Sequence, residues 1–349
     1  MALVSLRFKP GFVSHLSAFA KACHELGFES EFVVDLRYKR FPDLAAVAPV
    51  SVYTGTWQRG CFTHALFTNV SLQNRRLALQ LKAWGVRILY LYHEPWKRSL
   101  DFLKGEGFKG WISATLAHHA SKAMLKISDA VILGSRYGAE VYGERDVRYN
   151  RNAFHLPLMF DDEVLPTERE ELGRRQYFSY IGAICRSHGF DQYLAFVRES
   201  LRRKPNLRFL IASRLPLPPY VLKDPIIRRN LNRVEILCGR PLQTEEINEC
   251  YRESFCVWNL YWRSTQSGVL PKAFMFGTPV LASRLGSFCE YVKDRCNGRF
   301  GNPEDTQGIE AALDDIRENI ARYTVNCRKT FLETFFYRAN LQELARVLA

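Results

Sequence analysis

One segment in the last third of the chain, Ser267–Ser283, constrains the fold more than any other part of the sequence. A short loop with Gly268 opens it, and an apolar helical stretch follows over Ala273–Phe276. Gly277-Thr278-Pro279 then stops the helix before the buried strand-like run Val280–Ala282. This order of loop, helix, turn and strand places backbone N–H groups at a helix N-terminus, where anions bind. The segment therefore predicts a site for a diphosphate.

The rest of the chain alternates between strand-like and helix-like runs, a pattern typical of parallel sheets covered by helices on both faces. We expect two such halves, separated by the charged linker 165–175. The expected strands are Leu3–Phe8, Ser30–Asp35, Val50–Tyr53, Val86–Tyr92, Ala130–Leu133, Tyr177–Ile181, Arg208–Ala212, Val234–Leu237, Val257–Leu260 and Pro279–Ala282. The expected helices are Ser14–Leu26, Leu72–Trp84, Ala114–Ile127, Ser135–Tyr142, Gln192–Arg203, Glu245–Ser254, Pro271–Phe276, Gly308–Tyr323 and Phe331–Ala349.

The predicted fold class is thus α/β, with two doubly wound Rossmann-like domains that face each other across a cleft. The expected boundaries are 1–165 for the first domain and 166–330 for the second. The remaining helix, 331–349, is expected to cross back to the first domain.

Composition narrows the function classes. The 349 residues have a net charge of +13 that favours phosphorylated or polyanionic partners, and nine scattered Cys residues that indicate reduced thiols. No run approaches the roughly 20 apolar residues of a membrane span, and the N-terminus lacks a signal-peptide pattern, so we expect a cytoplasmic protein. Charge alone also permits nucleic-acid binding, but no zinc, RNP-like or helix-turn-helix signature accompanies it, so a nucleic-acid partner is not expected.

Five local motifs give the chain a resemblance to a known family. In order and spacing they resemble glycosyltransferases of the GT-B fold, and most of all the large retaining family numbered four (glycosyl transferases group 1). The motifs are Lys9–His15, Tyr92–Trp96, Ser128–Ser135, Tyr180–Gly189, and Gly277–Val280 followed by Gly286, Glu290 and Asn297-Gly298.

The resemblance breaks at the paired Glu residues that flank the donor loop in this family. The first maps to Ser264 and the second, which typically holds the nucleotide ribose, maps to Lys272. An ammonium only donates hydrogen bonds, so Lys272 would contact a phosphate or sugar hydroxyl instead. The family's Arg and Lys in the second domain map to Ala183 and His188, and Arg186 between them is expected to supply the displaced charge.

Negative charge builds on the leaving diphosphate during glycosyl transfer, and the chain has no Asp-x-Asp motif for a metal. We therefore expect metal-independent catalysis without a cofactor, in which a nucleotide-sugar is the substrate. His93, at the carboxyl end of a strand, is a candidate for proton transfer or for hydrogen bonding a sugar hydroxyl, and Glu94 beside it is a candidate for orienting acceptor or donor hydroxyls. The expected catalytic residues are His93, Glu94, Arg186 and Lys272, and the expected donor-binding residues are Gly11, Arg186, His188, Ser267, Gly268, Val269, Leu270, Lys272 and Glu290.

The leading hypothesis is a retaining glycosyltransferase that moves a sugar from a nucleotide-sugar donor to a hydroxyl acceptor, a glycan or lipid-linked glycan, in polysaccharide, lipopolysaccharide or glycolipid assembly. An anionic membrane surface at the inner face of the plasma membrane is an expected further partner. We expect that contact near Arg37–Pro42 and Lys97-Arg98, where Tyr38, Phe41 and Trp96 would supply interfacial aromatic rings. The alternatives are a binding protein with a decayed transferase site and another GT-B enzyme, such as a sugar-nucleotide epimerase.

Overall fold

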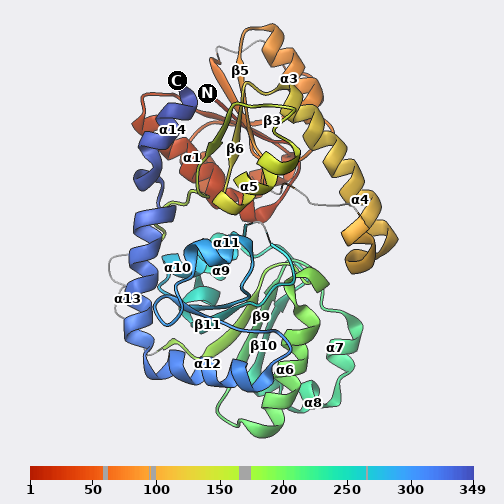
Figure 1. Ribbon diagram of the computed structural model, residues 1–349, viewed down its shortest axis with the longest axis vertical. Coiled ribbons are helices and arrows are strands. Elements are labelled where there is room, and N and C mark those ends of the chain that lie inside the picture. The colour runs from red at the N-terminus through yellow and green to blue at the C-terminus, as the bar shows by residue number, and fades with distance from the viewer. Residues whose placement is uncertain (58–61, 94, 96–99, 165–173, 265) are drawn as a thin grey trace. The chain divides into compact units, whose positions relative to one another are not determined.

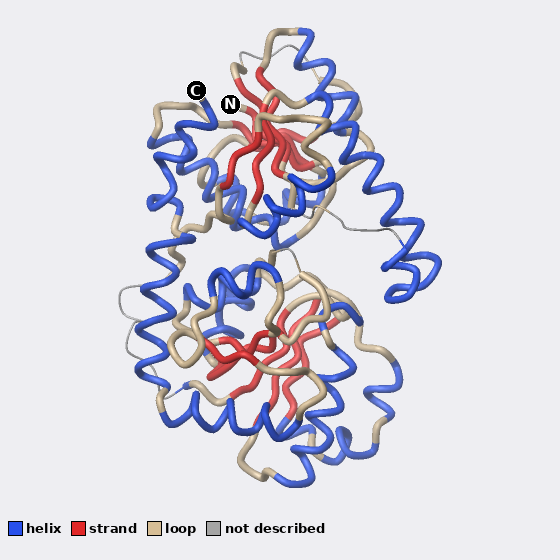
Figure 2. The backbone as a smooth tube through the Cα atoms, in the orientation of Figure 1, coloured by secondary structure: helices blue, strands red, loops and turns tan. Residues whose placement is uncertain are grey.

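The computed structural model describes residues 1–57, 62–93, 95, 100–164, 174–264 and 266–349. These residues form two compact units. The first combines Met1–Asp161 with Thr334–Ala349, and the second comprises Asp162–Glu333. Figure 2 shows that each unit is built around its own sheet with helices on both sides.

The first unit contains a seven-stranded parallel sheet in the order β3-β2-β1-β4-β5-β6-β7 (Figure 1). Its strands are β1 Ala2–Ser5, β2 Glu31–Val34, β3 Val50–Val52, β4 His64–Phe67, β5 Arg87–Leu91, β6 Ala130–Leu133 and β7 Ala153–His155. Its helices are α1 Val13–Glu25, α2 Pro42–Ala45, α3 Asn74–Ala83, α4 Leu100–Ile127, α5 Arg136–Arg145 and α14 Leu341–Leu348.

The strands of this sheet are largely apolar because both faces are covered. Successive side chains of a strand point to opposite faces. In β1, Leu3 belongs to the core that includes α1 and α14, whereas Val4 belongs to the core that includes α3 and α4. Leu344 and Val347 of α14 are fully buried in the first of these cores. The last helix of the chain is therefore an integral part of the first unit.

The second unit contains a six-stranded parallel sheet in the order β10-β9-β8-β11-β12-β13. Its strands are β8 Tyr177–Ile181, β9 Arg208–Ser213, β10 Val234–Cys238, β11 Ser254–Asn259, β12 Val280–Ala282 and β13 Gly298–Phe300. Its helices are α6 Phe190–Arg203, α7 Pro219–Lys223, α8 Pro225–Arg229, α9 Thr244–Arg252, α10 Val269–Met275, α11 Gly286–Tyr291, α12 Thr306–Glu318 and α13 Ile320–Thr330.

The predicted fold class is confirmed, and several local expectations are corrected. The run Gly308–Tyr323 is not one helix, because Asn319 separates α12 from α13. The end of the chain, 331–349, is not a single helix either. It contains a π-helical turn over Phe331–Phe335 and a 3-10 turn over Tyr337–Asn340 before α14. Three short strands, β4, β7 and β13, have no counterpart among the expected elements. Within the described ranges, none of the helices combines the length and apolar character that crossing a bilayer requires.

Candidate donor site

The turn after β8 is shaped by two glycines with positive φ. Gly182 has φ +132°, and Gly189 has φ +68° at the end of the 3-10 turn Arg186–His188. A Cβ on Gly189 would lie 2.4 Å from the carbonyl oxygen of Leu260. Only a glycine tolerates both this conformation and this contact. The turn after β8 is therefore pressed directly against the loop that follows β11.

A ring stack and two hydrogen bonds to backbone carbonyls hold the turn after β8 against the loop after β11. The His188 ring stacks on Tyr261 with centroids 4.2 Å apart and planes 7° from parallel. Trp258 Nε1 donates to the His188 carbonyl over 3.1 Å, and the Trp262 amide donates to the Ser187 carbonyl over 2.8 Å. Burial raises the pKa of Tyr261, and a hydrogen bond with Ser267 opposes this shift. The Tyr261 side chain thus connects His188 with the start of the donor loop.

Helix α10 begins beside the same turn. Val269, its first residue, has a methyl group 3.5 Å from the position that a Cβ on Gly182 would take. Leu270 is buried, so its side chain belongs to the core and only its backbone is available to a ligand. The loop before α10, with Ser267 and Gly268, and the turn with Arg186 are therefore neighbours, as the donor-site prediction requires.

The strand order explains why these segments meet. β8, β11 and β12 are adjacent in the parallel sheet, so the loops at their carboxyl ends share one edge. That edge is where open α/β sheets bind ligands. Arg186 is exposed in the loop after β8. Glu290 lies half-buried in α11, which follows β12.

Lys272 is buried in α10, and its ammonium forms an ion pair with the carboxylate of Glu163. Glu163 Oε2 also accepts a hydrogen bond of 2.9 Å from the side-chain amide of Asn248 in α9. The Lys272 ammonium lies 5.6 Å from the ring centroid of Phe276, the residue that follows α10. Burial lowers the pKa of Lys272, and the charge of Glu163 opposes this shift. The ammonium is thus held by a carboxylate, and its expected contact with a phosphate stays a prediction.

Sequence reasoning missed three polar side chains at this edge. Asn259 ends β11, pairs in register with Ala282 of β12, and is fully buried. Within the part of the chain that the structure describes, both polar atoms of its amide lack hydrogen-bond partners, as do the hydroxyls of the buried Ser283 and Ser287. The one sequence signal was an asparagine inside the apolar run 255–261. Such groups suit ordered water or the polar groups of a ligand.

Two of the residues predicted in the first unit, Gly11 and His93, follow strands β1 and β5 and lie at the carboxyl edge of that unit's sheet. His93 follows β5, and its Nε2 lies 2.8 Å from the Thr68 carbonyl oxygen, so this nitrogen carries a proton that it donates. Removal from solvent lowers the pKa of His93, and the nearby His15 and Lys9 lower it further. The ring meets Phe12 edge-on at 4.6 Å. The imidazole is therefore neutral near pH 7, with a fixed tautomer.

Gly11 and Glu94 are the other site residues that the sequence predicted in this unit. Gly11 lies in the 3-10 turn Pro10–Phe12, and a Cβ there would meet nothing within 4 Å. The turn therefore does not itself require glycine at this position. Glu94 lies outside the described residues, as do Trp96, Lys97 and Arg98. His15, which was not among the expected site residues, has its ring centroid 6.3 Å from that of His93.

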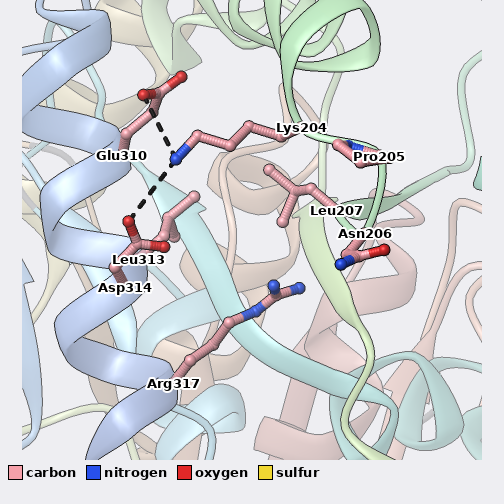
Figure 3. A pocket seen from close by; sticks show the side chains of 8 residues that line it. All are labelled: Lys204, Pro205, Asn206, Leu207, Glu310, Leu313, Asp314 and Arg317. Carbon is pink, nitrogen blue, oxygen red and sulfur yellow. Dashed lines mark ion pairs between the residues drawn. The ribbon is translucent and has the colours of Figure 1, made fainter.

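A separate pocket lies beside α12, lined by Lys204 and Leu207 and by Glu310, Asp314 and Arg317 of that helix (Figure 3). Lys204 forms ion pairs of 3.6 Å with Glu310 and 3.7 Å with Asp314. Residues 204–207 precede β9, so this pocket lies at the amino ends of the strands. It is therefore at the opposite edge of the sheet from the candidate donor site.

Comparisons with known proteins agree with this geometry. Residues 175–319 match the family model described as glycosyl transferases group 1. A comparison with curated protein sequences gave no significant match.

Solved structures share the fold over the whole chain. Anabaena HepE in complex with UDP-glucose is 17% identical, with a TM-score of 0.70 and coverage of 100% of this chain and 99% of that one. Sucrose-phosphate synthase from Thermosynechococcus elongatus is 15% identical, with a TM-score of 0.74 and coverage of 100% and 98%. A glycosyltransferase from Rickettsia africae is 10% identical, with a TM-score of 0.65 and coverage of 99% and 97%.

The family match covers nearly all of the second unit, including the turn after β8, the donor loop and α10. The two parallel sheets and the likeness to HepE and sucrose-phosphate synthase give the GT-B fold. The resemblance inferred from the motifs is therefore confirmed for residues 175–319, which match the glycosyl transferases group 1 model, within a chain that has the GT-B fold.

Proposed function

We propose that this protein transfers a sugar from a uridine diphosphate sugar to a hydroxyl of a glycan or lipid-linked glycan, with retention at the anomeric carbon and without a metal. One observation carries the proposal: the loops after β8, β11 and β12 bring Arg186, His188 and the start of α10 to one edge of the sheet. The choice of uridine rests on Anabaena HepE, which binds UDP and UDP-glucose in structures with this fold.

The proposed roles of these residues follow from the negative charge that develops on the diphosphate during the reaction. As the bond between sugar and phosphate breaks, negative charge grows on the diphosphate, and donors already in place stabilise it without reorganising. Arg186 can bind two phosphate oxygens at once through its planar guanidinium. The backbone N–H groups of Ser267–Leu270 supply further donors at the start of α10.

In the first unit, His93 supplies a neutral imidazole for the hydroxyl chemistry. Its Nε2 proton is committed to the Thr68 carbonyl, so Nδ1 is the ring nitrogen that can accept a hydrogen bond from a sugar hydroxyl. A protonated ring would have no acceptor. The lowered pKa of His93 therefore keeps the ring in the form that this role needs.

The carboxylate that typically holds the ribose in this family is replaced by Lys272, which is paired with Glu163. We propose that this exchange alters ribose binding while leaving the diphosphate site intact. The same observation supports the second candidate, a sugar-nucleotide-binding protein with a decayed transferase site. In either case we expect the protein in the cytoplasm, at an anionic membrane surface, working on polysaccharide, lipopolysaccharide or glycolipid.

Two measurements separate these candidates. A thermal-shift series with UDP, GDP, ADP and their sugar conjugates identifies the bound nucleotide, because a ligand selective for the folded state raises the melting temperature. UDP release from UDP-sugars, with and without glycan acceptors, then detects turnover. Stabilisation by UDP without release of UDP would favour the binding protein, whereas conversion of the sugar without transfer would indicate an epimerase. No stabilisation by any nucleotide would contradict both candidates.

A further inference from the structure

The long helix α4 of the first unit exposes an apolar stripe. Phe108 is 64% exposed, Ile112 40% and Leu116 51%. Because a helix turns once in 3.6 residues, this four-residue spacing puts the three side chains on one face. The ring of Trp111 stacks on Phe108 with centroids 5.7 Å apart. Single exposed apolar residues are ordinary on protein surfaces, but a row of large ones is an interaction surface.

The opposite side of α4 packs against the core of the unit, so the stripe is not part of that core. Ala114, Ser121, Met124 and Leu125 are buried, and Met124 and Leu125 belong to the core that α3 and the sheet share. The first turns of the helix extend past the sheet of their own unit in Figure 1. The large apolar side chains of the stripe therefore lie on the face of α4 that is turned away from the core of this unit.

Basic side chains extend the same face toward the C-terminal end of α4. Lys126 follows Phe108 by about five turns, so the two residues lie on one side of α4. The ammonium groups of Lys122 and Lys126 lie 5.7 and 5.5 Å from the ring centroid of Tyr149, and the Arg148 guanidinium lies 5.1 Å from it. Three cations therefore gather at the end of the apolar stripe.

Two of the aromatic rings that the sequence suggested for contact with a membrane, those of Tyr38 and Phe41, are buried. Tyr38 is fully buried with its hydroxyl 2.8 Å from Ser5 Oγ, and Phe41 is 5% exposed. Neither ring can enter a bilayer interface, so the expectation that they supply interfacial aromatic groups near Arg37–Pro42 is wrong. Exposed apolar side chains also occur elsewhere, Leu36 among them, but Phe108, Ile112 and Leu116 form a row on one helix face.

We propose that the α4 face, formed by Phe108, Trp111, Ile112 and Leu116 with the cations Lys122, Lys126 and Arg148, binds an anionic lipid bilayer. Helices that lie in a membrane interface combine an apolar row with Lys and Arg, and the cations attract anionic headgroups. The positive charge favours an anionic lipid surface over a neutral protein partner. The binding would hold the first unit at the membrane, where lipid-linked acceptors reside. That last step alone rests on the proposed function.

Vesicle co-sedimentation of the full chain tests the proposal. We expect binding to phosphatidylcholine vesicles with 30% phosphatidylglycerol at low salt, release at high salt, and at least tenfold weaker binding to phosphatidylcholine alone. Ile112→Glu with Leu116→Glu, and separately Lys122→Glu with Lys126→Glu, should each weaken binding at least tenfold. Leu79→Glu in α3 is the matched control, because Leu79 is 47% exposed on another helix of this unit. It should bind like the unaltered chain.

Lipids brominated in their acyl chains give a second readout. They should quench the fluorescence of the unaltered protein, and Trp111→Phe should remove most of that quenching. Equal binding to neutral and anionic vesicles, or undiminished binding by the α4 variants, would overturn the proposal, as would self-association through α4 without lipid binding. UDP-induced stabilisation measured in the same variants shows that they are folded. It also separates failure of this proposal from failure of the proposed function.

Discussion

The ammonium of Lys272 in α10 and the carboxylate of Glu163, near the start of the second unit, form an ion pair in which the two side chains are 6% and 18% exposed. Removing one partner of a buried pair leaves the other charge buried without compensation. We expect Glu163→Gln to destabilise the protein by about 3–5 kcal/mol. Exchanging the two charges, Glu163→Lys with Lys272→Glu, should recover most of this loss. Urea denaturation checks both effects, and a double variant no more stable than Glu163→Gln would contradict the pairing.

The close contact at Gly189 predicts a local and specific effect. Gly189→Ala should destabilise the second unit and weaken UDP binding, because its Cβ would meet the Leu260 carbonyl and the residue would keep a positive φ. Gly239→Ala is the control, since its φ is +95° but a Cβ there meets nothing closer than 4.0 Å. It carries the backbone strain without the clash. Similar UDP affinities for the two variants would show that contact between the two loops is unimportant for the site.

Arg186 is expected to act on the transition state. Arg186→Ala should lower kcat for sugar transfer by about 10²–10³, the usual effect of removing one such donor. Arg186→Lys should restore only part of the rate, because an ammonium cannot bind two oxygens in the same plane. Arg202→Ala, at an exposed position in α6, is the matched control for loss of one charge. A UDP-release assay measures all three, and turnover unchanged in Arg186→Ala would remove Arg186 from the site.

The lowered pKa of His93 predicts a pH dependence of stability with a definite sign. Below about pH 6.5 the unfolded chain protonates this His while the folded chain does not, so the free energy of unfolding falls as the pH falls. One such group contributes a slope of at most about 1.4 kcal/mol per pH unit. His93→Gln should reduce the slope between pH 6.5 and 5.5 by up to this amount, measured by urea titrations at several pH values. An unchanged slope would mean that His93 titrates normally in the folded protein.

The sequence was a good guide wherever local pattern decides structure. β8 has the predicted bounds, Tyr177–Ile181, because a run of buried residues is bounded by clear breaks. The four-residue strand β4 was missed, since such a short apolar run has no period that separates a strand from a loop. α4 was expected to begin at Ala114 but begins at Leu100, because Gly105, Gly107 and Gly110 favour a loop by propensity.

The candidate site likewise has features that local sequence patterns indicate and features that they do not. The order of the motifs indicated the fold, and the structure brings Gly182, in the turn before Arg186, beside Val269 at the start of α10. The partner of Lys272 was not predictable, because Glu163 lies 109 residues away and no local pattern connects them. The stack of His188 on Tyr261 is likewise a tertiary contact, as is the burial of Asn259 at the end of β11. Side-chain partners across the fold depend on packing, which periodicity does not encode.

The first unit is discontinuous in the chain, and this has a consequence for biosynthesis. The strands of its sheet are translated before the second unit, yet its core includes Leu344 and Val347 of α14, which are translated after the entire second unit. Domains generally fold as units while the chain emerges, so the second unit can mature first. The sheet that is translated before the second unit is therefore the one whose core is completed last.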